Sequence, residues 1–338
     1  MPLNRKKGES KDYRVAEKTL IRLSMLLVLF SGCSGDFDAK APLDKKMVIF
    51  SVLSTDREVQ FVRVQTDYMP SGYDPMSYSS DNFVSDASVV ITGPGKTYEL
   101  RDTLLWRSDT SRYKFPLRAY YVSPFTPQRG KSYQLEVRSP SYGLAAASVV
   151  VPDQPRISIT PVVAQVIDRP DRSPLGTFIT FNIQLSRSTV GYLARLYLYY
   201  DVLKESEWVE EVVEIPITSA DSSSYSLDIP QYPQMTSAPS TSQVAIFYRN
   251  GYYKGTLNKL NDRYRSTQVI FKWAAFVVLQ ADKNLFDYYA STHAGQDPFS
   301  IRLDEPMTSN VGGGVGMVGA YSLDSLVHLL PYDFWGNR

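Results

Sequence analysis

Short apolar runs separated by turn-forming residues recur along most of the chain. In the first half they include "KKMVIFSVLS", "ASVVITGPGKTYEL", "GKSYQLEVRSP" and "GLAAASVVVP". Apolar and polar positions alternate within these runs, which is typical of strands with one face in a core, and Gly93-Pro94-Gly95 supplies a hairpin turn. Regularly spaced short strands of this kind predict an Ig-like or transthyretin-like β-sandwich over residues 43–152.

One of these runs departs from simple alternation. In "EVQFVRVQT", Val59 and Phe61 alternate first, and Val62 and Val64 then continue the alternation one position later. An extra residue in a strand produces this kind of slip, so the pattern predicts a β-bulge.

The second half is also rich in strand patterns. The segment "PDQP" marks a boundary at residues 152–155, and a second β-rich domain is predicted over residues 156–338. Its strands are expected in "RISITPVV", "TFITFNIQL", "YLARLYLYYDVL" and "STQVIFKWAAFVVLQAD", whereas "EWVEEVVEIPI" fits a strand or a short helix.

One segment, "DKNLFDYYASTHA", has a helical pattern. Asp282 is a suitable N-cap, and Leu285, Phe286 and Tyr289 share one face at helical spacing. We expect a helix near residues 282–292 that packs on the core of the second domain. The fold class predicted is therefore mostly β with one short helix, in agreement with 24 Tyr and 13% aromatic residues.

The N-terminal residues have the organisation of a secretory signal peptide. Seven Lys and Arg precede the apolar run Leu23–Phe30, and Ser31-Gly32-Cys33 follows it. A membrane-spanning helix needs about twenty apolar residues, so this run is too short to be one. The ending resembles the bacterial lipobox, which predicts a lipoprotein signal peptide over residues 1–32 and lipid attachment to Cys33. The alternative is a buried or free cysteine.

The charge of the chain changes when this segment is removed. Residues 1–32 contain 7 of the 36 Lys and Arg and 3 of the 35 Asp and Glu, so the remainder has 29 basic and 32 acidic residues, formally −3. Nucleic-acid-binding domains are usually strongly basic, so no nucleic-acid partner is predicted. Residues 33–42 are polar and form the expected tether between the lipid and the first domain. With Cys33 lipidated, no thiol remains for a disulfide or a thiolate site.

A glycine motif near the C-terminus matches a dinucleotide-binding fingerprint. Gly314-Val-Gly316-Met-Val-Gly319-Ala320 fits G-x-G-x-x-G/A. That fingerprint must open a helix inside a βαβ unit, and too few residues follow Gly319 to form one. We therefore expect a turn and a strand with closely packed backbones and positive φ, and no dinucleotide cofactor.

Other candidate catalytic patterns also fail on their context. Ser111 and Lys114 match S-x-x-K but lie in an alternating stretch, and Ser80-Asp81-Asn82 precedes them, whereas in penicillin-recognising enzymes it follows. The two histidines, His293 and His328, have no metal-ligand or triad spacing.

An acidic cluster in the second half is the remaining candidate for a metal site. It lacks the glycine turn and the alternating oxygen ligands of a calcium loop, so a solvated face is expected. Its members are Glu205, Glu207, Glu210, Glu211 and Glu214. No catalytic, cofactor-binding or metal-binding residues are predicted for the chain.

The mature chain resembles the DUF4249 family of Bacteroidetes outer-membrane lipoproteins over nearly its whole length. The resemblance rests on the cysteine followed by "KKMVIFSVLS", on "ASVVITGPGKTYEL", "GKSYQLEVRSP" and "VVVPDQP", and above all on "DYYASTHAGQDPFSIRLDEPMTSNVGGGVGMVGAYS". Its most specific positions are Pro306, Asn310, Val311, Gly313, Gly314, Gly316, Gly319 and Ala320. The sequence departs from the family at Phe50-Ser51, where an acidic residue is common.

The resemblance implies a protein lipid-anchored in the cell outer membrane and often encoded near TonB-dependent transporters. We expect a non-enzymatic binding or accessory component that works with such a transporter. Two alternatives stay open: a hydrolase of surface polymers, which would need a cleft with paired carboxylates, and a purely structural or adhesion lipoprotein.

Overall fold

The computed structural model consists mostly of β-strands, which confirms the predicted class. It describes residues 44–68, 80–107, 110, 115–160, 178–217, 231–265, 267–293 and 309–328. In these residues the strands form three sheets, and there are two helices, of which the sequence pattern predicts only α3 (Lys283–His293).

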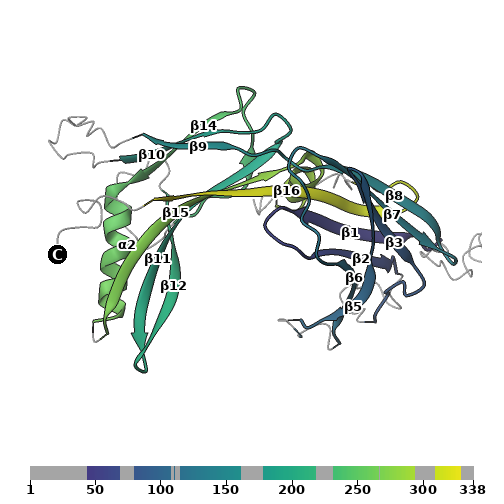
Figure 1. Ribbon diagram of the computed structural model, residues 1–338, viewed down its shortest axis with the longest axis horizontal. Helices are drawn as coiled ribbons and strands as arrows, with labels where there is room; N and C mark the ends of the chain where they lie inside the picture. Colours follow the sequence, from purple (N-terminus) through teal and green to yellow (C-terminus); the bar gives the residue numbers. More distant parts are fainter. Residues whose placement is uncertain are drawn as a thin grey trace, which may run out of the picture. The chain divides into compact units, whose positions relative to one another are not determined.

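The largest sheet has nine strands and contains residues from both halves of the chain. Its strands follow the order β12-β11-β15-β16-β1-β2-β6-β5, and β13 pairs with β11 (Figure 1). The strands are β1 (Met47–Ser54), β2 (Gln60–Thr66), β5 (Arg101–Leu105), β6 (Leu117–Val122), β11 (Gly191–Lys204), β12 (Glu207–Ile215), β13 (Thr236–Ser237), β15 (Val269–Ala281) and β16 (Val315–His328). The last strand, β16, is parallel to β1 and antiparallel to β15, so it joins the two halves of the sheet.

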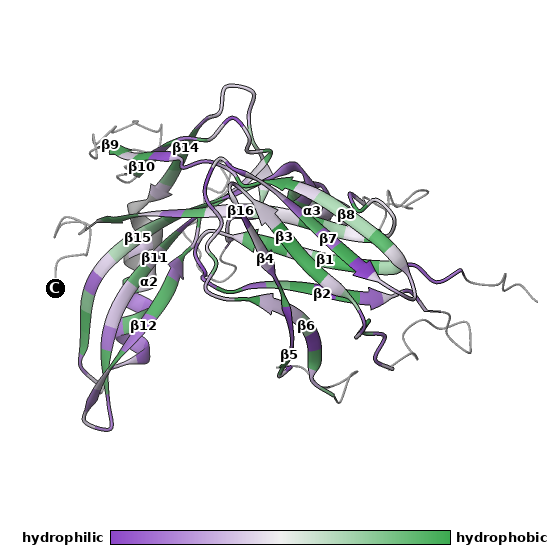
Figure 2. Ribbon diagram, turned by 45° about the vertical axis from the view of Figure 1, so that its right-hand side comes forward, coloured by the Kyte–Doolittle hydropathy of each residue, from purple (hydrophilic) through white to green (hydrophobic). Residues whose placement is uncertain are grey.

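A four-stranded sheet, in the order β4-β3-β7-β8, packs with β1, β2 and β16 to form the first hydrophobic core. Its strands are β3 (Ser88–Gly93), β4 (Lys96–Glu99), β7 (Ser132–Ser139) and β8 (Gly143–Val150). Alternate residues of these strands are buried, for example Tyr133, Leu135 and Val137 of β7. Figure 2 shows the resulting concentration of hydrophobic residues along β1, β7 and β8.

A three-stranded sheet and helix α2 form the second core with β11 and β15. The elements are β9 (Arg156–Thr160), β10 (Phe178–Gln184), β14 (Gln243–Arg249) and α2 (Asn250–Arg263). Helix α2 buries Tyr253, Leu257 and Leu260 on one face, at the spacing of a helical stripe. Phe181 of β10 stacks on Phe276 of β15 with ring centroids 3.9 Å apart.

The two cores meet near the predicted boundary, where a buried glutamine connects the strands. Gln280 of β15 is fully buried, and its Oε1 accepts hydrogen bonds from Ser186 N at 2.7 Å and Thr189 Oγ1 at 2.9 Å. Its Nε2 donates to Asp153 O at 2.7 Å and to Ser322 Oγ at 3.2 Å. The division into two domains at residues 152–156 stays a prediction. The largest sheet contains strands from both sides of this boundary.

The bulge predicted in β2 is not present. Residues 62–66 pair with β1 in continuous register, and burial alternates without interruption along the strand. Gln60, Val62 and Val64 face the first core, while Phe61 lies on the opposite face, where its ring is 6.5 Å from that of Tyr121. The prediction is wrong because it placed Phe61 in the core, whereas Gln60 takes that place through hydrogen bonds to Ser54, Arg57 and Phe125.

Candidate functional site

The glycine motif forms a turn and the start of β16, as predicted. Gly313 and Gly316 have φ values of 76° and 125°, a region that side chains with a Cβ rarely adopt. A Cβ on Gly316 would collide with the carbonyl oxygen of Ile49 on β1, and one on Gly314 would lie 2.8 Å from the carbonyl oxygen of Met47. These glycines therefore permit close backbone approach between β16 and β1, and no helix begins at this motif.

Asp282 caps α3 as predicted and also fixes β16. Its Oδ1 accepts hydrogen bonds from Leu285 N at 3.0 Å and Ala320 N at 2.9 Å, and its own N–H donates to Ala320 O. Burial raises the pKa of the Asp282 carboxyl above its ordinary value, although hydrogen bonds from backbone N–H groups and from Asn284 partly offset this effect. The carboxyl is a structural connection between helix and sheet.

The predicted face of α3 packs on strands at their glycines. Leu285 lies against Gly319 of β16, and Phe286 lies against Gly191 of β11. Neither side chain belongs to the second hydrophobic cluster, so the expected packing on the second core is corrected. In addition, Tyr288 contacts Phe50 of β1 edge-to-face, with ring centroids 5.8 Å apart.

The acidic cluster lies on the β11–β12 hairpin, and part of it is engaged in hydrogen bonds. Glu211 accepts hydrogen bonds from Tyr200 Oη at 2.9 Å and Tyr264 Oη at 2.7 Å, and it pairs with Lys204. These bonds, first that from Lys204 and then that from Tyr264, lower the pKa of Glu211 to about 2. Within the described ranges, no group of three or more His, Cys, Asp or Glu residues is arranged to hold a metal ion.

The other candidate residues are scattered. His293 ends α3 and His328 ends β16. Cys33, Ser111 and Lys114 lie outside the described residues. In the described part of the chain, no helix has the length and apolarity needed to cross a membrane.

A hollowed surface lies on the outer face of the large sheet, opposite the first core. Paired residues of neighbouring strands share a face, and Phe50 pairs with both Arg63 of β2 and Met317 of β16. Two cavities of about 270 Å³ and about 310 Å³ open on this face, and Arg63 lines both of them. We call this surface the Arg63 face. The larger cavity is lined mainly by apolar residues, among them Phe50, Val52, Phe61 and Leu117.

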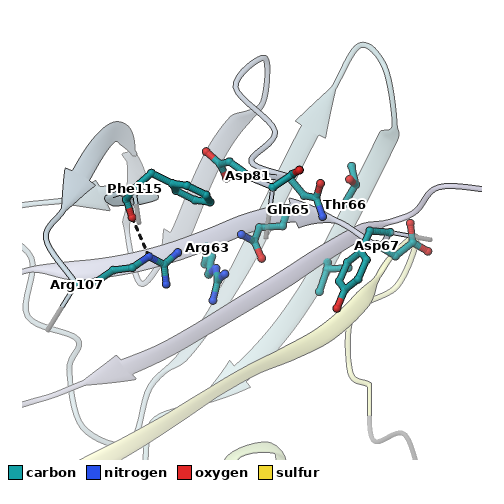
Figure 3. A pocket seen from close by; sticks show the side chains of 11 residues that line it. Arg63, Gln65, Thr66, Asp67, Asp81, Arg107 and Phe115 are labelled. Atoms are coloured by element: carbon teal, nitrogen blue, oxygen red, sulfur yellow. Dashed lines mark hydrogen bonds between the residues drawn. The ribbon is translucent and has the colours of Figure 1, made fainter. Parts of the chain in front are cut away.

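The smaller cavity is polar and contains charges of both signs. Arg63 and Arg107 contribute guanidinium groups, and Asp67 and Asp81 contribute carboxylates. In Figure 3 the two arginines lie toward one end of the cavity and Asp67 toward the other. Arg107 Nε donates to Phe115 O at 3.1 Å.

Both carboxylates of the smaller cavity accept backbone hydrogen bonds. Asp67 Oδ1 accepts from Lys46 N at 2.9 Å, and Asp81 Oδ1 accepts from Phe83 N at 3.1 Å. Asp81 belongs to the S-D-N triplet, which therefore lines a cavity although the S-x-x-K enzyme context is missing. The arrangement suits binding of a small polar or zwitterionic group, because it offers fixed charges of both signs in a hollow.

Sequence reasoning did not identify the Arg63 face. Its residues come from β1, β2, β5, β6 and β16 and from loops, among them Asp67, Asp81 and Arg107, and only the fold brings them together. A signal exists in "QFVRVQT", where simple alternation sets Phe61, Arg63 and Gln65 on the face opposite Val62 and Val64. The predicted bulge obscured that signal.

The fold and this surface define a mostly β protein with two hydrophobic cores and a partly polar hollow on its largest sheet. A family model described as "Domain of unknown function (DUF4249)" matches residues 36–326. The chain belongs to this family.

Other comparisons add little. No curated protein matches the chain. Among solved structures, the C-terminal globular domain of an oligosaccharyltransferase from Pyrococcus abyssi is similar at 10% identity, with a TM-score of 0.20. The match covers 70% of this chain and 46% of the oligosaccharyltransferase domain, so this chain spans less than half of the length of that domain. A likeness at this level carries no argument about function.

Proposed function

We propose that the protein is a lipid-anchored outer-membrane lipoprotein that acts as a non-enzymatic binding or accessory component, working with a TonB-dependent transporter. The sequence around Cys33 supports lipid attachment at that residue. The resemblance to the DUF4249 family supports the outer-membrane location and the transporter partner. Two or more acyl chains on one cysteine give stable membrane attachment, so no membrane-spanning segment is needed.

The single observation that supports a binding role most strongly is the Arg63 face. Two adjoining cavities share one arginine on the outer face of a sheet whose other face is packed in a core. Each cavity is near the lower limit of small-molecule sites, which suits a few side chains of a partner or one small polar group. Arginine offers a planar set of donors that can bind a carboxylate in bidentate geometry.

The proposal is tested by affinity purification of the tagged protein from gently solubilised outer membranes. The wild type should retain a β-barrel transporter, and Arg63→Glu should lose it because the shared cation is reversed. Arg138→Glu is the matched control, since Arg138 is an exposed arginine of β7 that pairs only with Glu136 among the contacts described.

Three results would contradict the proposal. A wild-type protein that is purified alone and degrades members of a glycan panel would favour the hydrolase alternative. A wild-type protein that retains no transporter and has no such activity would favour a structural or adhesion role. Equal retention by Arg63→Glu and the wild type would show that the partner binds elsewhere.

A further inference from the structure

The outermost strand of the large sheet, β12, has an open edge. In the described residues, β12 pairs only with β11, in antiparallel register from Leu196↔Ile215 to Lys204↔Glu207. A strand with one neighbour presents half of its backbone N–H and C=O groups to solvent, and another extended chain can pair with them. The edge is nine residues long and uninterrupted by proline.

Three large apolar side chains of β12 are exposed to solvent. Trp208, Val209 and Val212 are 47%, 38% and 52% exposed. Next to them on the same sheet, Tyr199 stacks on Trp273 with ring centroids 5.7 Å apart. Natural proteins usually protect long edges with charged residues, especially lysine, with proline or with bulges. β12 contains no lysine, proline or bulge, and its only protective residues are glutamates.

The charge of the strand indicates what can pair with it. The sequence of β12, "EWVEEVVEI", has four glutamates and no cationic residue. Three of these glutamates already have a cation: Glu211 pairs with Lys204, Glu214 with Arg195, and Glu210 with Lys272. Lys272 is also shared with Asp201, and no ion pair is found for Glu207 among the described residues, so an excess of negative charge remains at this edge. Opposite charges across paired strands stabilise a sheet, whereas like charges directly opposite each other destabilise it. Two copies of β12 would therefore set glutamates against glutamates, and a basic strand would complement them.

We propose that the edge of β12 accepts an extended, basic segment of a partner protein as an added strand. Backbone hydrogen bonds hold the segment, its Lys or Arg side chains oppose the glutamates, and its apolar side chains cover Trp208 and Val212. This surface is distinct from the Arg63 face, so the inference goes beyond the proposed function and does not depend on it.

The test uses the full protein in detergent and two nine-residue peptides. In the basic peptide, lysine stands opposite each glutamate of β12 in antiparallel pairing and valine fills the other positions; in the acidic peptide, glutamate replaces each lysine. The basic peptide should bind and slow hydrogen exchange of backbone amides within residues 207–215, and the acidic peptide should not bind. Affinity for the basic peptide should fall at least about ten-fold in the variant Glu207→Lys/Glu210→Lys. Glu99→Lys is the matched control, because Glu99 is an exposed glutamate on β4, which is also an edge strand.

Backbone methylation separates strand addition from simple charge attraction. Two basic peptides that are N-methylated at the odd or at the even positions keep the same charge but lose alternate N–H donors. One of the two should lose binding and the other should keep it, because only one edge of the peptide faces β12. Equal binding of both methylated peptides, protection outside residues 207–215, or a wild-type dimer joined through β12 would overturn the proposal.

Discussion

β16 and β12 are long strands of the same sheet, and they differ in almost every physical respect. β16 has a partner on each side, is rich in glycine at its start, and buries Met317, Val318 and Ala320. β12 has one partner among the strands that the structure describes, is rich in glutamate, and leaves Trp208 and Val212 about half exposed.

The difference shows how neighbours determine the composition of a strand. In β16, small residues allow a parallel strand and α3 to approach closely, and each larger side chain would meet backbone or packed atoms. In β12, Trp208, Val209 and Val212 meet solvent, so at these positions charge and solubility are limiting and volume is not. A substitution should therefore be costly at the buried positions of β16 and nearly neutral at the exposed positions of β12.

The largest effect is expected at Gly316. Gly316→Val adds strain at φ 125° and a collision with the Ile49 carbonyl, which together should lower the free energy of unfolding by on the order of 4 kcal/mol. Urea denaturation measures this loss. Gly95→Val is the control, because Gly95 also has positive φ but has open space around its Cβ position, and its cost should be about 1–2 kcal/mol. Equal losses at the two sites would show that close packing of β16 against β1 contributes nothing.

Removal of the carboxyl that connects α3 to β16 should have the next largest effect. Asp282→Ala loses the N-cap and the bond to Ala320 N, and should cost about 2–3 kcal/mol in the same denaturation experiment.

Asp282→Asn provides the control and a test of pH dependence. It keeps an acceptor oxygen and should cost less than the alanine variant. The folded-state pKa of Asp282 lies above 3.8, the ordinary value that applies to the unfolded chain. Between these two pKa values the folded protein holds a proton that the unfolded chain has lost. The wild type should therefore lose stability relative to Asp282→Asn as the pH rises from 3.8 through the folded-state pKa. A wild type that gains relative stability over this interval would contradict the raised pKa.

A matched pair of substitutions compares the two strands directly. Val318→Thr in β16 places a hydroxyl at a position that is 1% exposed, and should cost about 2 kcal/mol. Val212→Thr in β12 makes the same change at a position that is 52% exposed, and should change stability by less than about 0.5 kcal/mol. Thermal and urea denaturation should agree on this order, and a reversed order would refute the contrast between the strands.

A smaller effect than that of Val318→Thr is expected from Glu211, the hydrogen-bonded glutamate of β12. Glu211→Gln should cost about 1 kcal/mol at neutral pH, because the carboxylate is partly exposed and solvent weakens its pairing. Its folded-state pKa of about 2 lies below the ordinary value of 4.5, so its contribution is present above pH 4.5 and is lost as the pH falls toward 2. Glu207→Gln on the same strand should have almost no effect at any pH. A constant difference between wild type and Glu211→Gln from pH 7 to pH 2 would argue against the lowered pKa.

Local features of the fold could be predicted from the sequence. Alternation identified strands in both halves, and the Asp282 cap identified α3. Each of these inferences depends on residues close together in the chain, where the periodicity of side chains determines the structure.

The features that were not predicted depend on distant residues or on weak local patterns. The parallel pairing of β16 with β1 joins residues more than 250 positions apart, and no local pattern specifies it. Helix α2 has a buried stripe at Tyr253, Leu257 and Leu260, but glycine and asparagine residues between them weaken the helical pattern. The Arg63 face was missed for both reasons. Five strands and several loop residues form it, and the sequence pattern placed Phe61 of β2 on the wrong side of the sheet.

The attachment of lipid to Cys33 is the claim on which the proposed location and partner both depend, and intact-protein mass spectrometry of the protein from its native membrane tests it most directly. We expect a mature chain that begins at Cys33, lacks residues 1–32 and carries two or three acyl chains, and we expect Cys33→Ser to abolish this modification. A mature protein with an unmodified Cys33 thiol, or a chain that still begins at Met1, would contradict the anchor and the outer-membrane function built on it.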